Sequence, residues 1–173
     1  DGARFANAVA SGAESPAALT WRAGVDALSF GATKNGAMAA EALIFFHPDD
    51  AALAEFHRKR SGHLWSKHRY LAAQFDAYLQ DDLWLRLASK SNDKMAQVKD
   101  VIDATDFISV VAGGDANELF VTMKPDVAAF LYEKGHTFFS WPSLPNAYRL
   151  VTSFTTEQQE IDALRNNLSG FKG

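Results

Sequence analysis

The chain has 173 residues, with 17 lysines and arginines against 21 aspartates and glutamates, so its formal net charge is −4 at pH 7. A content of 47% hydrophobic and 12% aromatic residues is enough to form a packed core, which excludes a disordered or low-complexity chain, and the acidic balance argues against a nucleic-acid-binding protein. The absence of cysteine excludes a disulfide framework, a thiolate zinc site and a cysteine nucleophile.

The longest stretch without a formal charge runs from Gly135 to Tyr148 and is broken by Pro142 and Pro145. It is shorter than the ~20 apolar residues that a membrane-spanning helix needs. We therefore expect a soluble, cytosolic protein with no membrane partner. The chain begins at Asp1, without a methionine and without the apolar stretch of a signal peptide, so we expect either a processed form or a piece of a longer protein.

The first fifty residues predict short elements of both kinds. Apolar runs that are bounded by glycine or proline are typical of strands. We expect a helix over Ala3–Val9 and strands over Val25–Phe30 and Ala42–Phe46. The two predicted strands are separated by residues 31–40, a turn-rich stretch of mostly small side chains.

From Pro48 to Ala104 the apolar residues recur at helical spacing, with an interruption at Asp81 and Asp82. After Thr105 short apolar runs return in the order β-β-α-β-β-α, which predicts a compact α+β domain over residues 105–173, distinct from residues 1–104. Its expected elements are strands over Phe107–Ala112, Leu119–Met123, Thr137–Trp141 and Tyr148–Phe154, a helix over Pro125–Glu133, and a last helix that begins with a capping box at Thr156–Gln159.

Lys34 is the most informative single position. It is the only charged residue between Ala27 and Ala40, and its neighbours are small. A lysine on a tight turn after a buried strand lies where desolvation can lower its pKa, and the neutral amine is the nucleophile that a Schiff base requires. An exposed turn lysine is the alternative, and the local sequence does not decide between the two.

Three further groups of charged residues are candidates for function. Asp1 and Arg4 lie one turn apart at the start of the first predicted helix, so both can face one pocket, and an aspartate can pair with the pyridinium nitrogen of pyridoxal 5'-phosphate (PLP); helix capping is the alternative. Arg149 lies on a predicted strand, where its guanidinium can grip a carboxylate or form a salt bridge on an edge strand. The run Arg58–Arg60 is either a solvated helix end or an anion contact. No histidine pair has the spacing of a metal motif, so no metal is expected.

The segments around these residues, taken together, resemble a known family. They are residues 1–8, residues 26–36 around Lys34, residues 58–63 and residues 148–153. In order and spacing they are similar to the C-terminal half of the low-specificity L-threonine aldolases, which are fold-type I, PLP-dependent enzymes. The resemblance implies an α/β fold in which residues 1–104 form the C-terminal part of a PLP-binding large domain with long connecting helices, followed by a small α+β domain over residues 105–173.

The resemblance also implies a role for each candidate residue. Lys34 corresponds to the lysine that forms a Schiff base with PLP, and Asp1 to the aspartate that pairs with the pyridine nitrogen. Arg4 corresponds to an arginine near the phenolic oxygen of the cofactor and the substrate carboxylate. Arg149 corresponds to the small-domain arginine that binds the substrate carboxylate. More loosely, Arg58–Arg60 resembles a basic stretch near the cofactor phosphate or a subunit interface.

The implied reaction is the cleavage of L-threonine and related β-hydroxy-α-amino acids, such as phenylserine, to glycine and an aldehyde. The resemblance further implies a cytoplasmic enzyme of amino-acid metabolism that assembles as a homotetramer with active sites at dimer interfaces. Two alternatives stay open. One is another fold-type I lyase that eliminates a β-substituent from an amino acid, and the other is a non-catalytic fragment of such an enzyme.

In the family, the phosphate-binding loop, the ring-stacking residue and the base histidine belong to the N-terminal half, which lies outside this sequence. We therefore expect this chain alone not to bind PLP tightly, and the N-terminal half of the same enzyme to be its partner. Addition of PLP to the 173-residue chain should give no absorbance band of protein-bound cofactor, and such a band would contradict the prediction. A complementary N-terminal half should restore the band.

Overall fold

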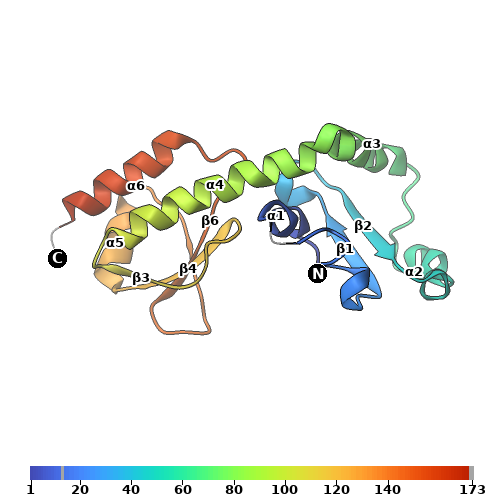
Figure 1. Ribbon diagram of the computed structural model, residues 1–173, viewed down its shortest axis with the longest axis horizontal. Helices are drawn as coiled ribbons and strands as arrows, with labels where there is room; N and C mark the ends of the chain where they lie inside the picture. Colours follow the sequence, from blue (N-terminus) through green and yellow to red (C-terminus); the bar gives the residue numbers. More distant parts are fainter. Residues whose placement is uncertain (13, 172–173) are drawn as a thin grey trace. The chain divides into compact units, whose positions relative to one another are not determined.

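The computed structural model describes residues 1–12 and 14–171, and it divides into two compact units, unit 1 (Asp1–Ala88) and unit 2 (Ser89–Gly173) (Figure 1). The division falls inside the long helix α4 (Leu83–Asp103), ahead of the domain boundary that the sequence predicts at residues 104/105. Among the described residues, no helix is long and apolar enough to cross a membrane.

Unit 1 is built around a two-stranded antiparallel sheet, in which Phe30 of one strand lies opposite Ala42 of the other. Helices precede and follow the sheet, as the sequence predicts (Figure 1). The elements of this unit are α1 (Phe5–Ala10), β1 (Ala27–Gly31), β2 (Glu41–Phe45), α2 (Ala54–Arg60), α3 (His68–Leu79) and the first turns of α4.

The core of unit 1 is an aromatic cluster centred on Phe30. Alternation along β1 turns Leu28 and Phe30 inward, where both are buried. The Phe30 ring lies 5.7 Å from the ring of Phe75 and 6.2 Å from that of Tyr78, both on α3. It also meets Trp84 edge-on, at a centroid distance of 5.9 Å. Burial of these large rings holds α3 and the start of α4 against the sheet.

The first residues of the chain add a parallel partner to β1. The Gly2 amide donates to the Ser29 carbonyl at 2.9 Å, and the Gly31 amide donates to the Gly2 carbonyl at 3.3 Å. The approach leaves no room for a side chain, because a Cβ at Gly2 would lie 2.5 Å from the Ser29 oxygen. The chain therefore pairs with β1 on both edges, antiparallel through β2 and parallel through Gly2.

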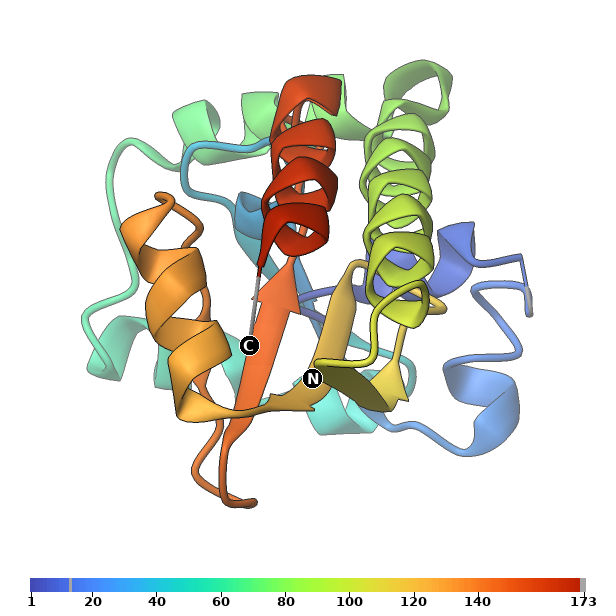
Figure 2. The same ribbon diagram turned by 90° about the vertical axis from the view of Figure 1, so that its left-hand side faces the viewer.

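Unit 2 is an α+β unit with a four-stranded antiparallel sheet in the order β3-β4-β6-β5. The later turns of α4 run beside α6 in both views of the fold (Figures 1 and 2). The elements are β3 (Ile108–Gly113), β4 (Glu118–Met123), α5 (Pro125–Glu133), β5 (Phe139–Ser140), β6 (Ala147–Val151) and α6 (Gln158–Gly170). Their order is the one that the sequence predicts.

The two faces of this sheet differ in character. Alternation along β4 buries Leu119, Val121 and Met123, which pack into one core with apolar residues of α4, α5 and α6. The opposite face carries Phe120 and Arg149, which lie directly across from one another in the β4–β6 pair. Arg149 therefore lies on the face of the sheet that points away from the apolar core.

Several predicted boundaries are wrong. The helical region is not continuous, because α2 ends at Arg60 and α3 begins at His68. Strand β6 ends at Val151, where the predicted strand continues to residue 154. The capping box of α6 is formed by Glu157 and Glu160. The predicted box begins one residue too early, because the hydroxyl of Thr156 already accepts a hydrogen bond from the Ser153 amide at 2.9 Å.

The parallel pairing at Gly2 can be tested by adding one methyl group. In Gly2→Ala the new Cβ would lie 2.5 Å from the Ser29 oxygen and 2.6 Å from the Leu28 side chain, so we expect a loss of about 1–3 kcal/mol in the free energy of unfolding. Urea denaturation measures the change. The control is Gly170→Ala, where a Cβ meets nothing within 4 Å and stability should stay within about 0.5 kcal/mol. Equal stabilities of the two variants would rule out the close approach at Gly2.

Candidate active site

Lys34 lies in a one-turn 3₁₀ helix (Thr33–Asn35) that follows β1 directly. The turn is closed by its own hydrogen bonds, because the Ala32 amide donates to the Ala40 carbonyl at 2.9 Å and the Ala40 amide donates to the Thr33 hydroxyl at 3.1 Å. Gly36, with a φ of 121°, supplies a backbone conformation that other residues rarely adopt. The small residues around Lys34 thus form a closed loop at the end of a buried strand.

This loop is anchored by the residue that follows Lys34. Asn35 is only 3% exposed, and its side-chain amide donates to the Tyr78 hydroxyl at 2.6 Å and to the Trp84 carbonyl at 2.8 Å. Gln74 of α3 holds the other arm of the loop, since its side-chain oxygen accepts from two successive backbone amides, at residues 38 and 39. The loop that carries Lys34 is therefore tied to α3 and to the first turn of α4.

The side chain of Lys34 itself is exposed. The desolvation that the sequence argument invokes is not provided by the part of the chain that the structure describes. What this chain provides is a fixed backbone position, with the buried Ala32 and Asn35 on either side of the exposed lysine. Within unit 1, Lys34 is therefore an exposed turn lysine. A desolvated Schiff-base lysine would need further residues to cover its side chain.

Asp1 and Arg4 lie beside this loop, although not as the sequence predicts. Helix α1 begins at Phe5, so Asp1 lies outside it, and one oxygen of its carboxylate accepts from the Ala3 amide at 2.9 Å. Because Gly2 pairs in parallel with β1, the residues after Gly2 and the residues after β1 leave the sheet at the same end. The contact is close: a Cβ at Gly31 would lie 3.1 Å from the Cα of Ala3.

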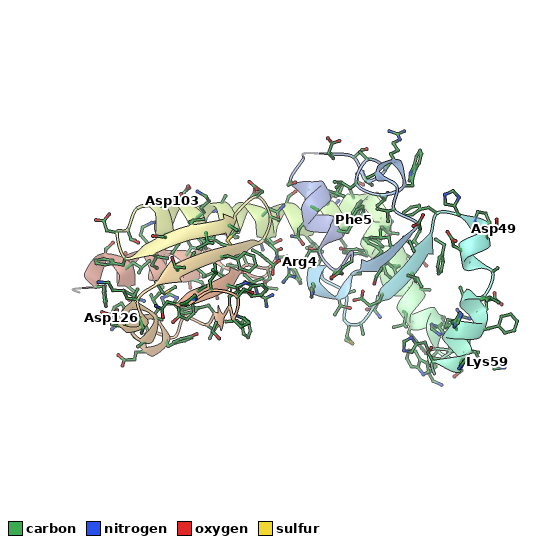
Figure 3. All side chains as sticks on the ribbon, turned by 90° about the horizontal axis from the view of Figure 1, so that it is seen from below. Arg4, Phe5, Asp49, Lys59, Asp103 and Asp126 are labelled. Carbon is green, nitrogen blue, oxygen red and sulfur yellow. The ribbon has the colours of Figure 1, made fainter. Side chains whose placement is uncertain are left out.

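The basic run on α2 is not part of this arrangement. Arg58, Lys59 and Arg60 form the last turn of α2, and all three are exposed. Figure 3 shows Lys59 well away from Arg4 and Phe5, which mark the start of α1 in the same unit. Within unit 1, the run is a solvated helix end.

Arg149 belongs to unit 2 and lies on an interior strand rather than on an edge strand. Its guanidinium carbon lies 5.6 Å from the ring centroid of Phe139 and 5.7 Å from that of Trp141. One terminal nitrogen lies 3.5 Å from the Glu118 carboxylate, with both side chains about three-quarters buried (29% and 24% exposed). The buried Nε of Arg149 has no hydrogen-bond partner among the described residues. The expected salt bridge is present, but it leaves part of the guanidinium unused.

Unit 1 therefore brings the Asp1–Arg4 segment and the loop that carries Lys34 to one end of its sheet, whereas Arg149 lies in unit 2. No group of acidic residues, histidines or cysteines with the arrangement of a metal site occurs among residues 1–12 and 14–171. An amine, a carboxylate and a guanidinium near one sheet end can bind a carbonyl compound that also carries a basic nitrogen or an anionic group.

The sequence does not indicate which residues hold the Lys34 loop and the Arg149 side chain in place. Asn35 lies next to a candidate residue, but its partner Tyr78 is 43 positions away and reads as an apolar residue of a helix. Glu118 reads as an ordinary exposed strand position until the β4–β6 register places it near Arg149. The one sequence signal is the asparagine beside the isolated lysine. A side-chain amide that is buried there needs a polar partner.

Three comparisons bear on the chain. Residues 1–139 match the model of a protein family described as Beta-eliminating lyase. A low specificity L-threonine aldolase of Pseudomonas aeruginosa is 36% identical over 168 residues, which are 97% of this chain and 48% of that protein. A second low specificity L-threonine aldolase, from another Pseudomonas strain, is 35% identical and is covered to 47% of its length. The chain thus spans about half the length of the curated relatives it matches.

A solved structure shows the same fold. The threonine aldolase of Leishmania major superposes with a TM-score of 0.87 and 28% identity, over 98% of this chain and 50% of that one. The fold of this chain is therefore shared with half of that protein, and the predicted fold class is confirmed.

Proposed function

Because the chain belongs to the Beta-eliminating lyase family, we propose that it is the C-terminal part of a PLP-dependent enzyme that cleaves L-threonine and related β-hydroxy-α-amino acids. The products are glycine and an aldehyde. The observation that carries the proposal is the meeting of the Lys34 loop and the Asp1–Arg4 segment at one end of the sheet. Relatives named low specificity L-threonine aldolase support the choice of substrate.

The residues present fit PLP. Lys34 offers a primary amine for the cofactor aldehyde on a loop that is fixed at both ends. Asp1 uses only Oδ1 in its bond to the Ala3 amide, and its negative charge would hold a proton on the pyridine nitrogen. Arg4, the residue just before α1, lies three positions from Asp1 and would contact the phenolic oxygen. When bound, PLP acts as an electron sink that stabilises negative charge at the substrate Cα.

Arg149 would bind the substrate carboxylate. A guanidinium offers five N–H donors in a planar fork, so a group already paired with Glu118 can still hold a second carboxylate. The rings of Phe139 and Trp141 lie within cation–π distance of the guanidinium and restrict its position. A fixed carboxylate orients the bond between Cα and Cβ of the substrate, which is the bond that breaks in this reaction.

A second candidate reaction is β-elimination, which the description of the matching family favours. It would use the same lysine and carboxylate-binding arginine, but it releases a β-substituent and yields a 2-oxo acid and ammonia instead of glycine and an aldehyde. Product analysis with threonine and with a substrate that carries a good β-leaving group separates the two.

We also propose a cytoplasmic homotetramer, on the basis of the family resemblance alone. The mass of the complete enzyme in solution tests the assembly.

Replacement of Lys34 tests the proposed function directly. In the complete enzyme that carries this chain, Lys34→Ala should reduce the cleavage of threonine or phenylserine below detection, because the amine that binds the cofactor is lost. Formation of glycine, or of benzaldehyde from phenylserine, measures the activity. Lys124→Ala, at an exposed position just before α5, should leave turnover unchanged. Normal turnover by Lys34→Ala would refute the assignment.

Arg149→Gln tests the carboxylate-binding role. Charge-assisted hydrogen bonds to the substrate would be lost, so we expect KM for threonine to rise about 10- to 100-fold, with a smaller change in kcat. The matched control is Arg165→Gln on α6, where the arginine is about half exposed and pairs with Asp162 at 2.9 Å; this variant should have a normal KM. An unchanged KM in Arg149→Gln would show that the substrate carboxylate binds elsewhere.

A further inference from the structure

The Lys34 loop is held by a buried polar cluster that the proposed chemistry does not use. Both hydrogens of the Asn35 side-chain amide are engaged, one with the Tyr78 hydroxyl at 2.6 Å and the other with the Trp84 carbonyl at 2.8 Å. Asn35 and Tyr78 are each only 3% exposed. Loss of either partner would leave a buried N–H group unsatisfied, so the cluster defines one position for the loop.

We propose that Asn35, Tyr78 and Gln74 are positioning residues that fix the backbone of Lys34 for its reaction with PLP, an inference that rests on the function proposed above. Lys34 directly precedes Asn35, so any shift of the amide moves the lysine Cα with it. A lysine side chain has four rotatable bonds and a large range of amine positions. The side chain of Lys34 is exposed, so a fixed Cα narrows the positions that its amine can reach.

Tyr78 is suited to this role because its surroundings fix the position of its ring and keep its hydroxyl protonated. Its ring packs at 6.2 Å from Phe30 and 6.4 Å from Phe75, which fixes the direction of the hydroxyl. Burial raises the pKa of Tyr78, and the hydrogen bond from Asn35 opposes part of that rise. The hydroxyl is therefore neutral in the range where such enzymes work, and it remains a constant acceptor for the Asn35 amide.

Gln74 acts on the opposite arm of the same loop. Its side-chain oxygen accepts from the amides of Met38 at 2.9 Å and Ala39 at 3.1 Å. These amides follow Gly36, whose positive φ turns the chain back toward β2. Because Gln74 and Tyr78 lie one turn apart on α3, a single helix face holds both arms of the loop.

The test measures the reactivity of Lys34 rather than catalysis. The complete enzyme, freed of cofactor, is mixed with PLP and reduced with borohydride at timed intervals; the lysine amine replaces the aldehyde oxygen, which leaves as water, and hydride reduces the resulting C=N bond to a stable amine. Peptide mass mapping then gives the modification rate at Lys34 and at each of the eight other lysines. A general loss of structure changes all rates, whereas a positioning role changes the rate at Lys34 alone.

Tyr78→Phe keeps the ring and removes only the accepting oxygen, so modification at Lys34 should slow about tenfold, the effect of one buried hydrogen bond. Tyr70→Phe is the matched control, because Tyr70 lies on the same helix, is 54% exposed, and its hydroxyl accepts a hydrogen bond from the neighbouring Arg69. It should react like the unaltered enzyme. A normal rate at Lys34 in Tyr78→Phe overturns the proposal while leaving the role of Lys34 intact.

Gln74 supplies a second pair of variants in case Tyr78→Phe lowers the melting temperature. Gln74→Leu removes the acceptor for two backbone amides and should slow modification at Lys34, whereas Gln74→Glu keeps an acceptor oxygen and should restore the rate. Equal rates in the two variants would overturn the role of Gln74. If the unaltered enzyme is not modified preferentially at Lys34, the proposed function itself fails, and the positioning proposal fails with it.

Discussion

The parallel pairing of Gly2 with β1 is the constraint on which the candidate site depends. Two backbone hydrogen bonds at 2.9 and 3.3 Å join the start of the chain to a strand more than twenty residues later. The strands can approach only because Gly2 has no side chain. The pairing sets the positions of Asp1 and Arg4 at the sheet end where the Lys34 loop begins.

The surface of unit 1 agrees with a chain that works as part of a larger enzyme. Met38, in the Lys34 loop, is 89% exposed, and Leu43 on β2 and Phe56 on α2 are 63% and 72% exposed. Apolar side chains of this size, when several are exposed together, are typical of interaction surfaces. They support the proposal that this chain is one part of a larger enzyme. Unit 2 has one apolar core between its sheet and three helices, and it also exposes large apolar side chains, such as Phe139 at 66%.

Lys34 and Arg149 are held in the structure in different ways. The side chain of Lys34 is exposed, whereas its backbone is fixed by the buried side-chain amide of Asn35. The side chain of Arg149 is held by contacts with two aromatic rings and by the Glu118 carboxylate. A covalent cofactor link needs an amine that can reach and react, whereas carboxylate recognition needs a planar group in one orientation. Each support matches the task proposed for the residue that it holds.

The sequence by itself determined the order of the elements, the α+β character of the second unit and the isolation of Lys34 between a strand and a turn. These features depend on local spacing: alternation in β4, glycine and proline at the ends of elements, and one charge among small residues. It missed the break between α2 and α3, and it placed the capping box of α6 one residue too early, where the Thr156 hydroxyl is already bonded to the Ser153 amide. Only the tertiary structure decided that Gly2 pairs with β1, that Asn35 bonds to Tyr78 and that Glu118 pairs with Arg149. Each of these joins residues far apart in the chain, and a local pattern carries no information on which distant groups a packed core brings within hydrogen-bonding distance.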